Sequence, residues 1–437
     1  LFSVNARVDG SSRFGTNNKY GFFPSASAGW RISEEAFMEP VKEVISNLKL
    51  RASYGFTGNT EIGVYESLAT LGTSNWILGN QLVSGFFPNK IPNPDLKWER
   101  TGQFDIGLDL GLFNNRLRIT TDYYKKKTTD LLYSVAVPAT SGYQTMLKNI
   151  GSIENQGYEL SIESDNLTGA FSWTTAFNIA FNRNKVLELG GEEYKEMAEG
   201  DGHLKTGSVR RLIVGEPIGV FYGYRFDGIF QNEEECKQQT SSASPIGVGL
   251  RRYKDLNGDG KVDAANDREI LGDANPKFFG GLTNTFAYKG FELNVFLQYS
   301  YGNKILNYNA MELENPTGGQ NAYADMVNRW TPENPSNIYP KATTNRALLV
   351  SDRFIEDGSY LKLKTLSLSY SFPKINLKHI QGLRLYVTGQ NLLTWTKYRG
   401  YDPEVSYRGA STLEAGEDFG GYPQSRTFMF GIKLDIK

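Results

Sequence analysis

One short segment of this 437-residue chain places oxygen atoms at the spacing of a calcium-binding loop. The segment runs from Asp255 to Asp263 and reads DLNGDGKVD. Loops of the EF-hand type alternate oxygen ligands along the chain and have a glycine at the sixth position, where this segment has Gly260. The expected ligands are the side chains of Asp255, Asn257, Asp259 and Asp263, the last directly or through water, and the carbonyl of Lys261.

The end of the segment departs from the EF-hand pattern. The twelfth position, which supplies a bidentate glutamate in EF-hands, is Asn266, and Asp267 follows one residue later. One extra residue in the Ala264-Ala265 pair would bring Asp267 into the ligand set. We expect a structural Ca²⁺ here that orders a loop and takes no part in catalysis. The alternative is a turn rich in glycine and aspartate or asparagine that holds no ion.

The rest of the sequence offers little material for catalysis. The chain has one cysteine, Cys236, and two histidines, His203 and His379, which lie far apart in the sequence. It contains no Gly-x-Ser-x-Gly elbow and no phosphate-binding loop. The acidic runs at 192–193 and 233–235 have no second carboxylate placed opposite them, so we interpret them as solvated loop charge. We therefore predict no catalytic residue, no required cofactor and no enzymatic activity.

The composition excludes some partners and is typical of others. The 47 Lys and Arg residues nearly balance the 48 Asp and Glu residues, so no basic stripe suggests binding to nucleic acid. Aromatic residues make up 13% of the chain, and it has 46 glycines, a combination that fits turn-rich β-structure with aromatic girdles. No apolar run reaches the roughly 18 residues of a membrane-spanning helix. Membrane β-barrels need no such run.

The elements that position these residues are strands with alternating apolar and polar side chains. The run that closes the chain shows the pattern clearly, because its apolar residues fall on one face: Phe428, Phe430, Ile432, Leu434 and Ile436. About 14 such segments follow one another, including a predicted pair at 209–214 and 219–229 joined by a turn at Gly215. A tight turn is expected at Asn114-Asn115, and a phase slip predicts a β-bulge near Lys364-Thr365.

Short and long connections alternate between these strands, as in outer-membrane barrels, whose long loops are extracellular. The long loops are expected near residues 58–97, 128–156, 184–207, 230–278, 302–357 and 397–425. We predict an all-β fold, a transmembrane antiparallel β-barrel whose apolar faces contact lipid and whose polar faces line a lumen. A soluble β-sandwich or propeller is the alternative.

Six segments in order along the chain carry a specific combination of motifs. They are residues 9–15 (DGSSRFG), 23–30 (FPSASAGW), 47–55 (NLKLRASYG), 219–224 (GVFYGY), 391–398 (NLLTWTKY) and 422–426 (YPQSR). The combination resembles the SusC/RagA family of TonB-linked outer-membrane transporters. That resemblance implies a barrel of about 22 strands, of which this chain would supply the C-terminal part, without the plug domain. Segments similar to the 255–263 loop also occur in that family.

The resemblance implies a function as well as a fold. We expect active import of glycans, oligosaccharides or peptides across the bacterial outer membrane, with energy from TonB-ExbB-ExbD through the missing N-terminal part and a SusD-like lipoprotein as a lid. Outer-membrane lipid would surround the strands, which pass through the membrane many times. The alternatives are an outer-membrane barrel enzyme of the lipase or protease type and a soluble glycan-binding β-protein. The sequence assigns no residue to cargo binding.

Overall fold

The computed structural model describes residues 1–437 except 144, 198–199, 201–202, 205, 316–320, 345–347, 373–379, 405, 410, 412 and 437. His379 is therefore outside the described residues. In the part of the chain that is described, no helix is both long and apolar enough to span a membrane. The chain divides into two compact units. Unit 1 comprises Leu1–Leu160 and Arg183–Glu193, and unit 2 comprises Ser161–Asn182 and Tyr194–Lys437.

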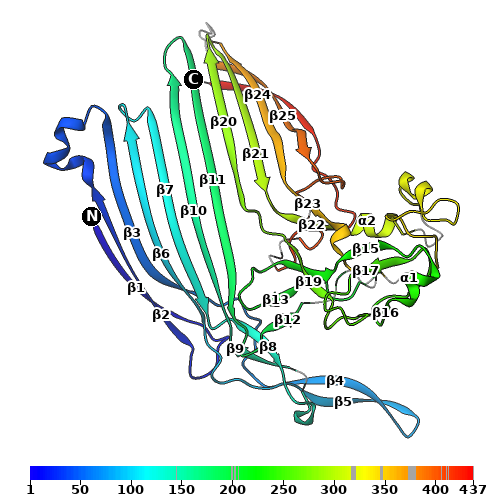
Figure 1. The fold of residues 1–437 in the computed structure, drawn as a ribbon. Helices are drawn as coiled ribbons and strands as arrows, with labels where there is room; N and C mark the ends of the chain where they lie inside the picture. Colours follow the sequence, from blue (N-terminus) through cyan, green and yellow to red (C-terminus); the bar gives the residue numbers. More distant parts are fainter. Residues whose placement is uncertain are drawn as a thin grey trace. The chain divides into compact units, whose positions relative to one another are not determined.

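Twelve strands form one sheet, and successive strands in the chain's order are neighbours in it (Figure 1). They are β1 (Phe2–Gly10), β2 (Tyr20–Arg31), β3 (Ile45–Asn59), β6 (Glu99–Leu112), β7 (Leu117–Thr129), β10 (Ser152–Leu167), β11 (Phe171–Glu188), β20 (Phe278–Tyr288), β21 (Phe291–Tyr301), β24 (Tyr360–Ser371), β25 (Ile380–Thr396) and β27 (Thr427–Ile436). The registers that are resolved between these neighbours are antiparallel, as the sequence predicts.

The remaining elements lie in the connections. Those of unit 1 are η1 (Ile32–Glu34), η2 (Ala36–Val41), β4 (Thr70–Leu78), β5 (Gln81–Lys90), β8 (Leu132–Ala136), η3 (Ala139–Ser141) and β9 (Thr145–Asn149). Those of unit 2 are β12 (Tyr194–Glu196), β13 (Arg211–Ile213), β14 (Val220–Tyr224), β15 (Phe226–Ile229), α1 (Glu233–Lys237), β16 (Thr240–Ser241), β17 (Arg251–Tyr253), β18 (Lys261–Val262), β19 (Arg268–Asp273), β22 (Lys304–Asn307), α2 (Tyr308–Leu313), η4 (Ala324–Asn328), η5 (Asp352–Phe354), β23 (Ile355–Asp357) and β26 (Glu417–Asp418).

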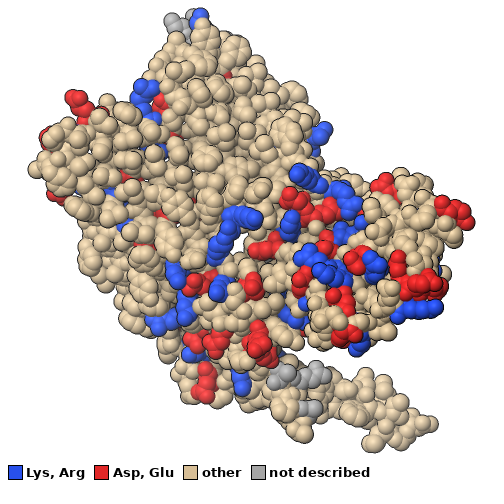
Figure 2. Space-filling view, in the orientation of Figure 1, with Lys and Arg blue, Asp and Glu red and all other residues tan. Residues whose placement is uncertain are grey.

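The apolar faces of the sheet strands point away from the protein. On β27, Phe430 is 80% exposed and Ile436 is 73% exposed, and the other apolar residues of that face are exposed as well. Burying such side chains in a non-aqueous medium is favourable, and large exposed apolar surfaces are typical of membrane or protein contacts. Figure 2 shows large parts of the strand surface without Lys, Arg, Asp or Glu. The predicted orientation of the strand faces is therefore confirmed.

Local features of the strands also follow the sequence. The β6–β7 turn has three successive residues in the left-handed region, Phe113, Asn114 and Asn115, with φ values of 53°, 58° and 61°. Asparagine tolerates this conformation, so the predicted tight turn is confirmed. Along β24, Thr365 pairs with Phe296 while Leu363 pairs with the next residue of β21, so Lys364 is the extra residue of a bulge. The predicted bulge is confirmed.

The predicted strand pair around Gly215 is wrong as part of the sheet. β13 pairs with β12, and β14 pairs with β19, so residues 189–277 form a single connection between β11 and β20. The physical reason is burial on both faces: Val220 and the adjacent Phe221 point to opposite sides of β14, yet both are buried. A barrel strand exposes one face to lipid, whereas β14 lies inside a folded core. Among the described residues, the sheet therefore has twelve strands, where about 14 were expected.

Candidate functional site

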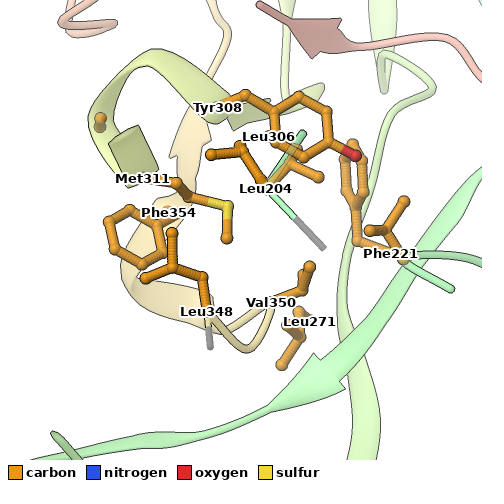
Figure 3. Packing of buried hydrophobic residues seen from close by; sticks show 11 residues of the cluster. Leu204, Phe221, Leu271, Leu306, Tyr308, Met311, Leu348, Val350 and Phe354 are labelled. Atoms are coloured by element: carbon orange, nitrogen blue, oxygen red, sulfur yellow. The ribbon is translucent and has the colours of Figure 1, made fainter. Parts of the chain in front are cut away.

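The three long connections of unit 2 fold together into one body, which we call the connection module. It consists of the described residues in 194–277, 302–359 and 397–426. Its centre is an apolar cluster drawn in Figure 3. Phe221 and Leu271 come from the first connection, and Leu306, Met311 and Phe354 come from the second. Because these side chains exclude water together, the connections form a packed structure rather than independent flexible loops.

The helix α2 and the third connection complete this core. The side chain of Asn307 caps α2 by accepting a hydrogen bond from the backbone N–H of Ala310 at 2.9 Å. This cap fixes the start of the helix and directs the buried Tyr308 into the cluster (Figure 3). Phe419, from the third connection, packs against the cluster and meets the ring of Tyr308 edge to face at 6.0 Å.

A buried ion pair links the first connection to the third. The guanidinium of Arg210 donates to Glu417 at 2.9 Å, and both side chains are almost completely buried. Arg210 also donates to the carbonyl oxygens of Gly219 and Ala415 and lies 4.2 Å from the ring centre of Phe221. Burial lowers the pKa of Arg210, while the charge of Glu417 and its hydrogen bond oppose that shift. Arg210 is therefore a buried positive charge, and most of its N–H groups have a hydrogen-bond acceptor.

A second buried cation fastens the third connection to the sheet. Lys362, on β24, is 1% exposed and donates to Asp402 at 2.6 Å and to Glu404 at 2.5 Å. The hydroxyl of Tyr360 adds a hydrogen bond to Glu404 at 3.2 Å. Burial by itself would raise the pKa values of both carboxyl groups, but the hydrogen bonds and the positive charge of Lys362 lower them below their ordinary values.

A third charged group centres on Glu314, at the end of α2. Its carboxylate accepts hydrogen bonds from Arg353 at 2.5 Å and from Arg399 at 2.7 Å. Arg399 also contacts Glu356 at 2.7 Å. Burial would lower the pKa of Arg399, but its hydrogen bonds to Glu356 and Glu314 raise it above the ordinary value. The second and third connections are thus joined by opposite charges.

These groups hold connections together and do not resemble a catalytic site. Arg210, Lys362 and Arg399 each contact at least one carboxylate, so the three clusters are networks of opposite charges. His203 lies 3.6 Å from Glu312 and stacks against Phe419, at 6.4 Å between ring centres. The arrangement therefore supports a shaped, rigid surface between long connections of the sheet.

The segment predicted to bind calcium follows β17 and includes β18, in the connection module. The carboxylate of Asp255 accepts hydrogen bonds from the N–H groups of Gly258 and Gly260, both at 2.7 Å, and both glycines have positive φ. Asp267 is fully buried and accepts from the N–H of Leu256 at 2.8 Å and of Asp263 at 2.7 Å. The structure therefore brings Asp267 to the loop despite its late position in the sequence.

The same loop supplies its own hydrogen-bond donors. Asn257 and Asp259 accept from backbone N–H groups two residues later, at 3.2 and 2.8 Å, and the ammonium of Lys261 contacts Asp263 at 3.2 Å. Among the described residues, no group of three or more His, Cys, Asp or Glu side chains is arranged to hold a metal ion. The donor chemistry suits Ca²⁺, because it consists of oxygen atoms alone. Calcium binding stays a prediction.

Opposite charges also meet on the polar face of the sheet in unit 1. Arg51 on β3 contacts Asp109 on β6 at 2.9 Å and Asp122 on β7 at 3.0 Å. These side chains lie on the face opposite the exposed residues Tyr54 and Phe104. A cavity of about 320 Å³ adjoins them, lined in part by Arg51 and Asp122. This face has the polar character expected of a lumen.

Sequence reasoning missed the charged clusters of the connection module. Arg210 and Glu417 are 207 residues apart, and Lys362 and Asp402 are 40 residues apart, so no short motif links the partners. One signal was present: Lys362 falls between the apolar residues Leu361 and Leu363 on β24, on the face that points away from lipid. That position indicates a buried or lumen-facing lysine, although it does not identify the partner.

Residues 1–392 match the protein-family model described as "TonB dependent receptor-like, beta-barrel". The chain is similar to the TonB-dependent receptor P3 of Formosa agariphila, with 41% identity over 99% of this chain and 44% of that protein. It is also similar to the TonB-dependent receptor SusC of Bacteroides thetaiotaomicron, with 32% identity over 100% of this chain and 42% of that protein. The chain thus spans less than half the length of these relatives.

A solved structure agrees with the sequence relatives. The structure of the RagAB peptide transporter superposes with a TM-score of 0.81 and 28% identity, covering 99% of this chain and 45% of that one. The RagAB peptide importer in its open-open state gives the same TM-score of 0.81. The fold therefore agrees over nearly the whole chain.

Proposed function

The chain belongs to the TonB-dependent receptor β-barrel family of the outer membrane, and we propose that it serves TonB-driven import of glycans, oligosaccharides or peptides. The observation that carries the proposal is the two-sided sheet of long antiparallel strands, with exposed apolar side chains on one face and charged pairs such as Arg51–Asp122 on the other. Such a wall separates lipid from an aqueous path. Relatives in this family are transporters and receptors, not enzymes.

The class of cargo has support from two sides. The RagAB complex, whose structure is similar to this chain, is a peptide transporter. The SusC/RagA motifs of the sequence support glycans or peptides. The chain's own residues do not decide between these two, so both remain within the proposal.

The partners belong to the proposal too. The resemblance to SusC/RagA transporters supports a SusD-like lipoprotein that covers the outer face, and TonB-ExbB-ExbD as the source of energy. The connection module is the part of unit 2 best suited to meet a lid, because its three connections are packed around a shared core and joined by buried ion pairs. A rigid surface loses little conformational entropy on binding.

The two rival functions are less well supported. An outer-membrane lipase or protease needs an activated nucleophile, whereas Arg210, Arg353 and Lys362 of unit 2 form ion pairs with carboxylates. A soluble glycan-binding protein would have to cover the apolar face of β27, whose residues are exposed. We therefore favour neither of these alternatives.

An uptake assay tests the proposal. Cells that carry the full-length gene should take up a labelled oligosaccharide or oligopeptide pool, and deletion of the gene or of the TonB system should abolish uptake. A variant with its TonB-contacting segment removed is the matched control, because it leaves the barrel intact. Uptake that persists after deletion of the TonB system would overturn the proposal.

We also propose that the 255–267 loop binds Ca²⁺ through Asp255, Asn257, Asp259, Asp263, Asp267 and the carbonyl of Lys261. The all-oxygen donor set and the approach of Asp267 to the loop support this assignment. Calorimetric titration of the purified protein should show Ca²⁺ binding that Asp255→Ala abolishes, with Asp227→Ala as a control outside the loop. The absence of heat at millimolar Ca²⁺ would exclude the site.

A further inference from the structure

A second candidate site lies in unit 1, outside the connection module. The strands β4 and β5 form a separate two-stranded hairpin within the connection from β3 to β6 (Figure 1). Gly79 and Asn80 make its two-residue turn, both with positive φ, which is the turn that matches the twist of a hairpin. Residues 70–89 contain no Asp, Glu, Lys or Arg. Apart from Lys90 at its end, the hairpin therefore presents an uncharged surface.

The rings of Trp76 and Phe87 pack flat against one face of this hairpin. Trp76 pairs with Val83, Ser74 with Gly85, and Gly72 with Phe87, so these are consecutive rows of the same face. A Cβ atom on Gly85 would lie 2.7 Å from the indole of Trp76, and one on Gly72 would lie 2.6 Å from the ring of Phe87. Each ring thus occupies the space that the glycine of the opposite strand leaves free.

The rings stay accessible although they are held in place. Trp76 is 62% exposed and Phe87 is 41% exposed. The ring of Trp76 covers the Ser74–Gly85 pair and the ring of Phe87 covers the Gly72–Phe87 pair. These pairs are about 7 Å apart, because neighbouring residues of one strand face are separated by two steps of about 3.4 Å. Two other aromatic residues of the long connections are packed against the protein instead: Tyr323 lies against the core of the connection module, and Trp330 lies over Gly249 and donates to Gln231 at 3.0 Å.

A cavity adjoins the Phe87 end of this face. Its volume is about 580 Å³, within the usual range for small-molecule sites. Phe87, Asn89 and Lys90 of the hairpin line one side, and Ser134 and Thr145 of the β8 and β9 strands line another. The ammonium of Lys90 lies 2.5 Å from the carboxylate of Glu66, which also lines the cavity, so these two charges balance. The cavity offers hydroxyl and amide groups without a net charge.

We propose that Trp76, Phe87 and this cavity form a binding site for a neutral oligosaccharide. The face of an aromatic ring carries negative potential and attracts the C–H groups on the apolar face of a sugar ring. Adjacent hydroxyl and amide side chains can then bind the sugar hydroxyls. An acidic polysaccharide or a charged peptide would need an unpaired charge, which the hairpin and the Glu66–Lys90 pair do not provide. The proposal rests on the sugar import proposed above, and binding at the hairpin can be measured without transport.

The experiment measures binding separately from transport. The full chain, purified in detergent, is titrated with neutral hexasaccharides of glucose, mannose, xylose and galactose, and Trp fluorescence and calorimetry report binding. At least one hexasaccharide should bind, and Trp76→Ala and Phe87→Ala should each weaken binding about tenfold or more, as expected when a stacking partner is lost. Phe86→Ala is the matched control, because Phe86 is 74% exposed on the opposite face of the same hairpin.

Each outcome decides the proposal. It is supported when the two variants of the Trp76 face weaken binding and Phe86→Ala does not. It is overturned when no neutral hexasaccharide binds, when all three variants bind equally well, or when a neutral hexapeptide pool binds in place of the sugars and Trp76→Ala abolishes that binding. Because these alanine substitutions are on exposed side chains, circular dichroism should show an unchanged fold.

Discussion

Arg51 reaches Asp122 across an intervening strand, and the contact of 3.0 Å passes over Gly107. In the register of the sheet, Arg51 on β3 pairs with Gly107 on β6, which in turn pairs with Asp122 on β7. A side chain at position 107 would meet both partners, because its Cβ would lie 2.2 Å from the carboxylate of Asp122 and 2.7 Å from the guanidinium of Arg51. Glycine is therefore required by this ion pair.

Gly107→Val should separate Arg51 from Asp122 and destabilise the barrel by about 1–3 kcal/mol, the usual range for a steric change in a packed polar network. The measurement is the temperature at which the protein in detergent loses its folded gel mobility. Gly29→Ala is the control, because a Cβ there meets nothing closer than 3.5 Å. Equal unfolding temperatures for the two variants would contradict this account.

Lys362→Met should leave Asp402 buried without its cation and Glu404 with the more exposed Lys364 alone. Removing one partner of a buried pair costs about 3–5 kcal/mol. The 397–426 connection should then detach from β24 and become sensitive to protease. Lys364→Met is the control, because Lys364 is more exposed and contacts Glu404 alone, at 3.0 Å.

The same cluster predicts a pH dependence. The folded-state pKa values of Asp402 and Glu404 are lowered, so their contribution to stability is present above the ordinary carboxyl range and is lost as the pH falls through the lowered values. Protease protection of residues 397–426 should therefore persist at pH 7 and disappear in acid. In Lys362→Met, protection should already be lost at neutral pH. Protection that does not change with pH would contradict the assignment.

Arg210 and Glu417 form the buried pair best suited to a double-mutant cycle. Arg210→Met leaves Glu417 with Arg408 as its cation, at 3.1 Å, and Glu417→Met leaves Arg210 without its carboxylate. Each change should destabilise the connection module, by up to about 3–5 kcal/mol. The combination Arg210→Met with Glu417→Met should cost less than the sum of the single changes. Hydrogen exchange of the β14 amides, which lie beside this pair, reports the difference. Strictly additive effects would show that the pair is not coupled.

Charged substitutions test whether the apolar face of β27 contacts lipid. Phe430→Arg places a charge on the exposed face and should destabilise the barrel by about 2–4 kcal/mol if the residue lies near the middle of the bilayer. Met429→Arg, one residue earlier and on the opposite face, should have a much smaller effect. Heat-modifiable migration of the protein extracted from membranes measures both. A larger effect at Met429 would reverse the assignment of the two faces.

Alternation of side chains was enough to predict the wall of the barrel. A strand with lipid on one side and water on the other alternates apolar and polar residues along its sequence. For that reason β27, β24 with its bulge and the β6–β7 turn could be located without coordinates. The same signal failed at residues 209–229. Periodicity reports apolar side chains but not what covers them, and both faces of β14 are covered by the connection module.

The loop of Asp255 could be found because its residues are consecutive, and its hydrogen bonds are local. The contacts of Arg210 with Glu417 and of Lys362 with Asp402 could not be found in this way. The partners lie far apart in the sequence and meet only when the connections pack together. Likewise, the sequence places Trp76 and Trp330 alike in long connections. Only the structure separates them, since an aromatic side chain is exposed or buried according to what folds over it.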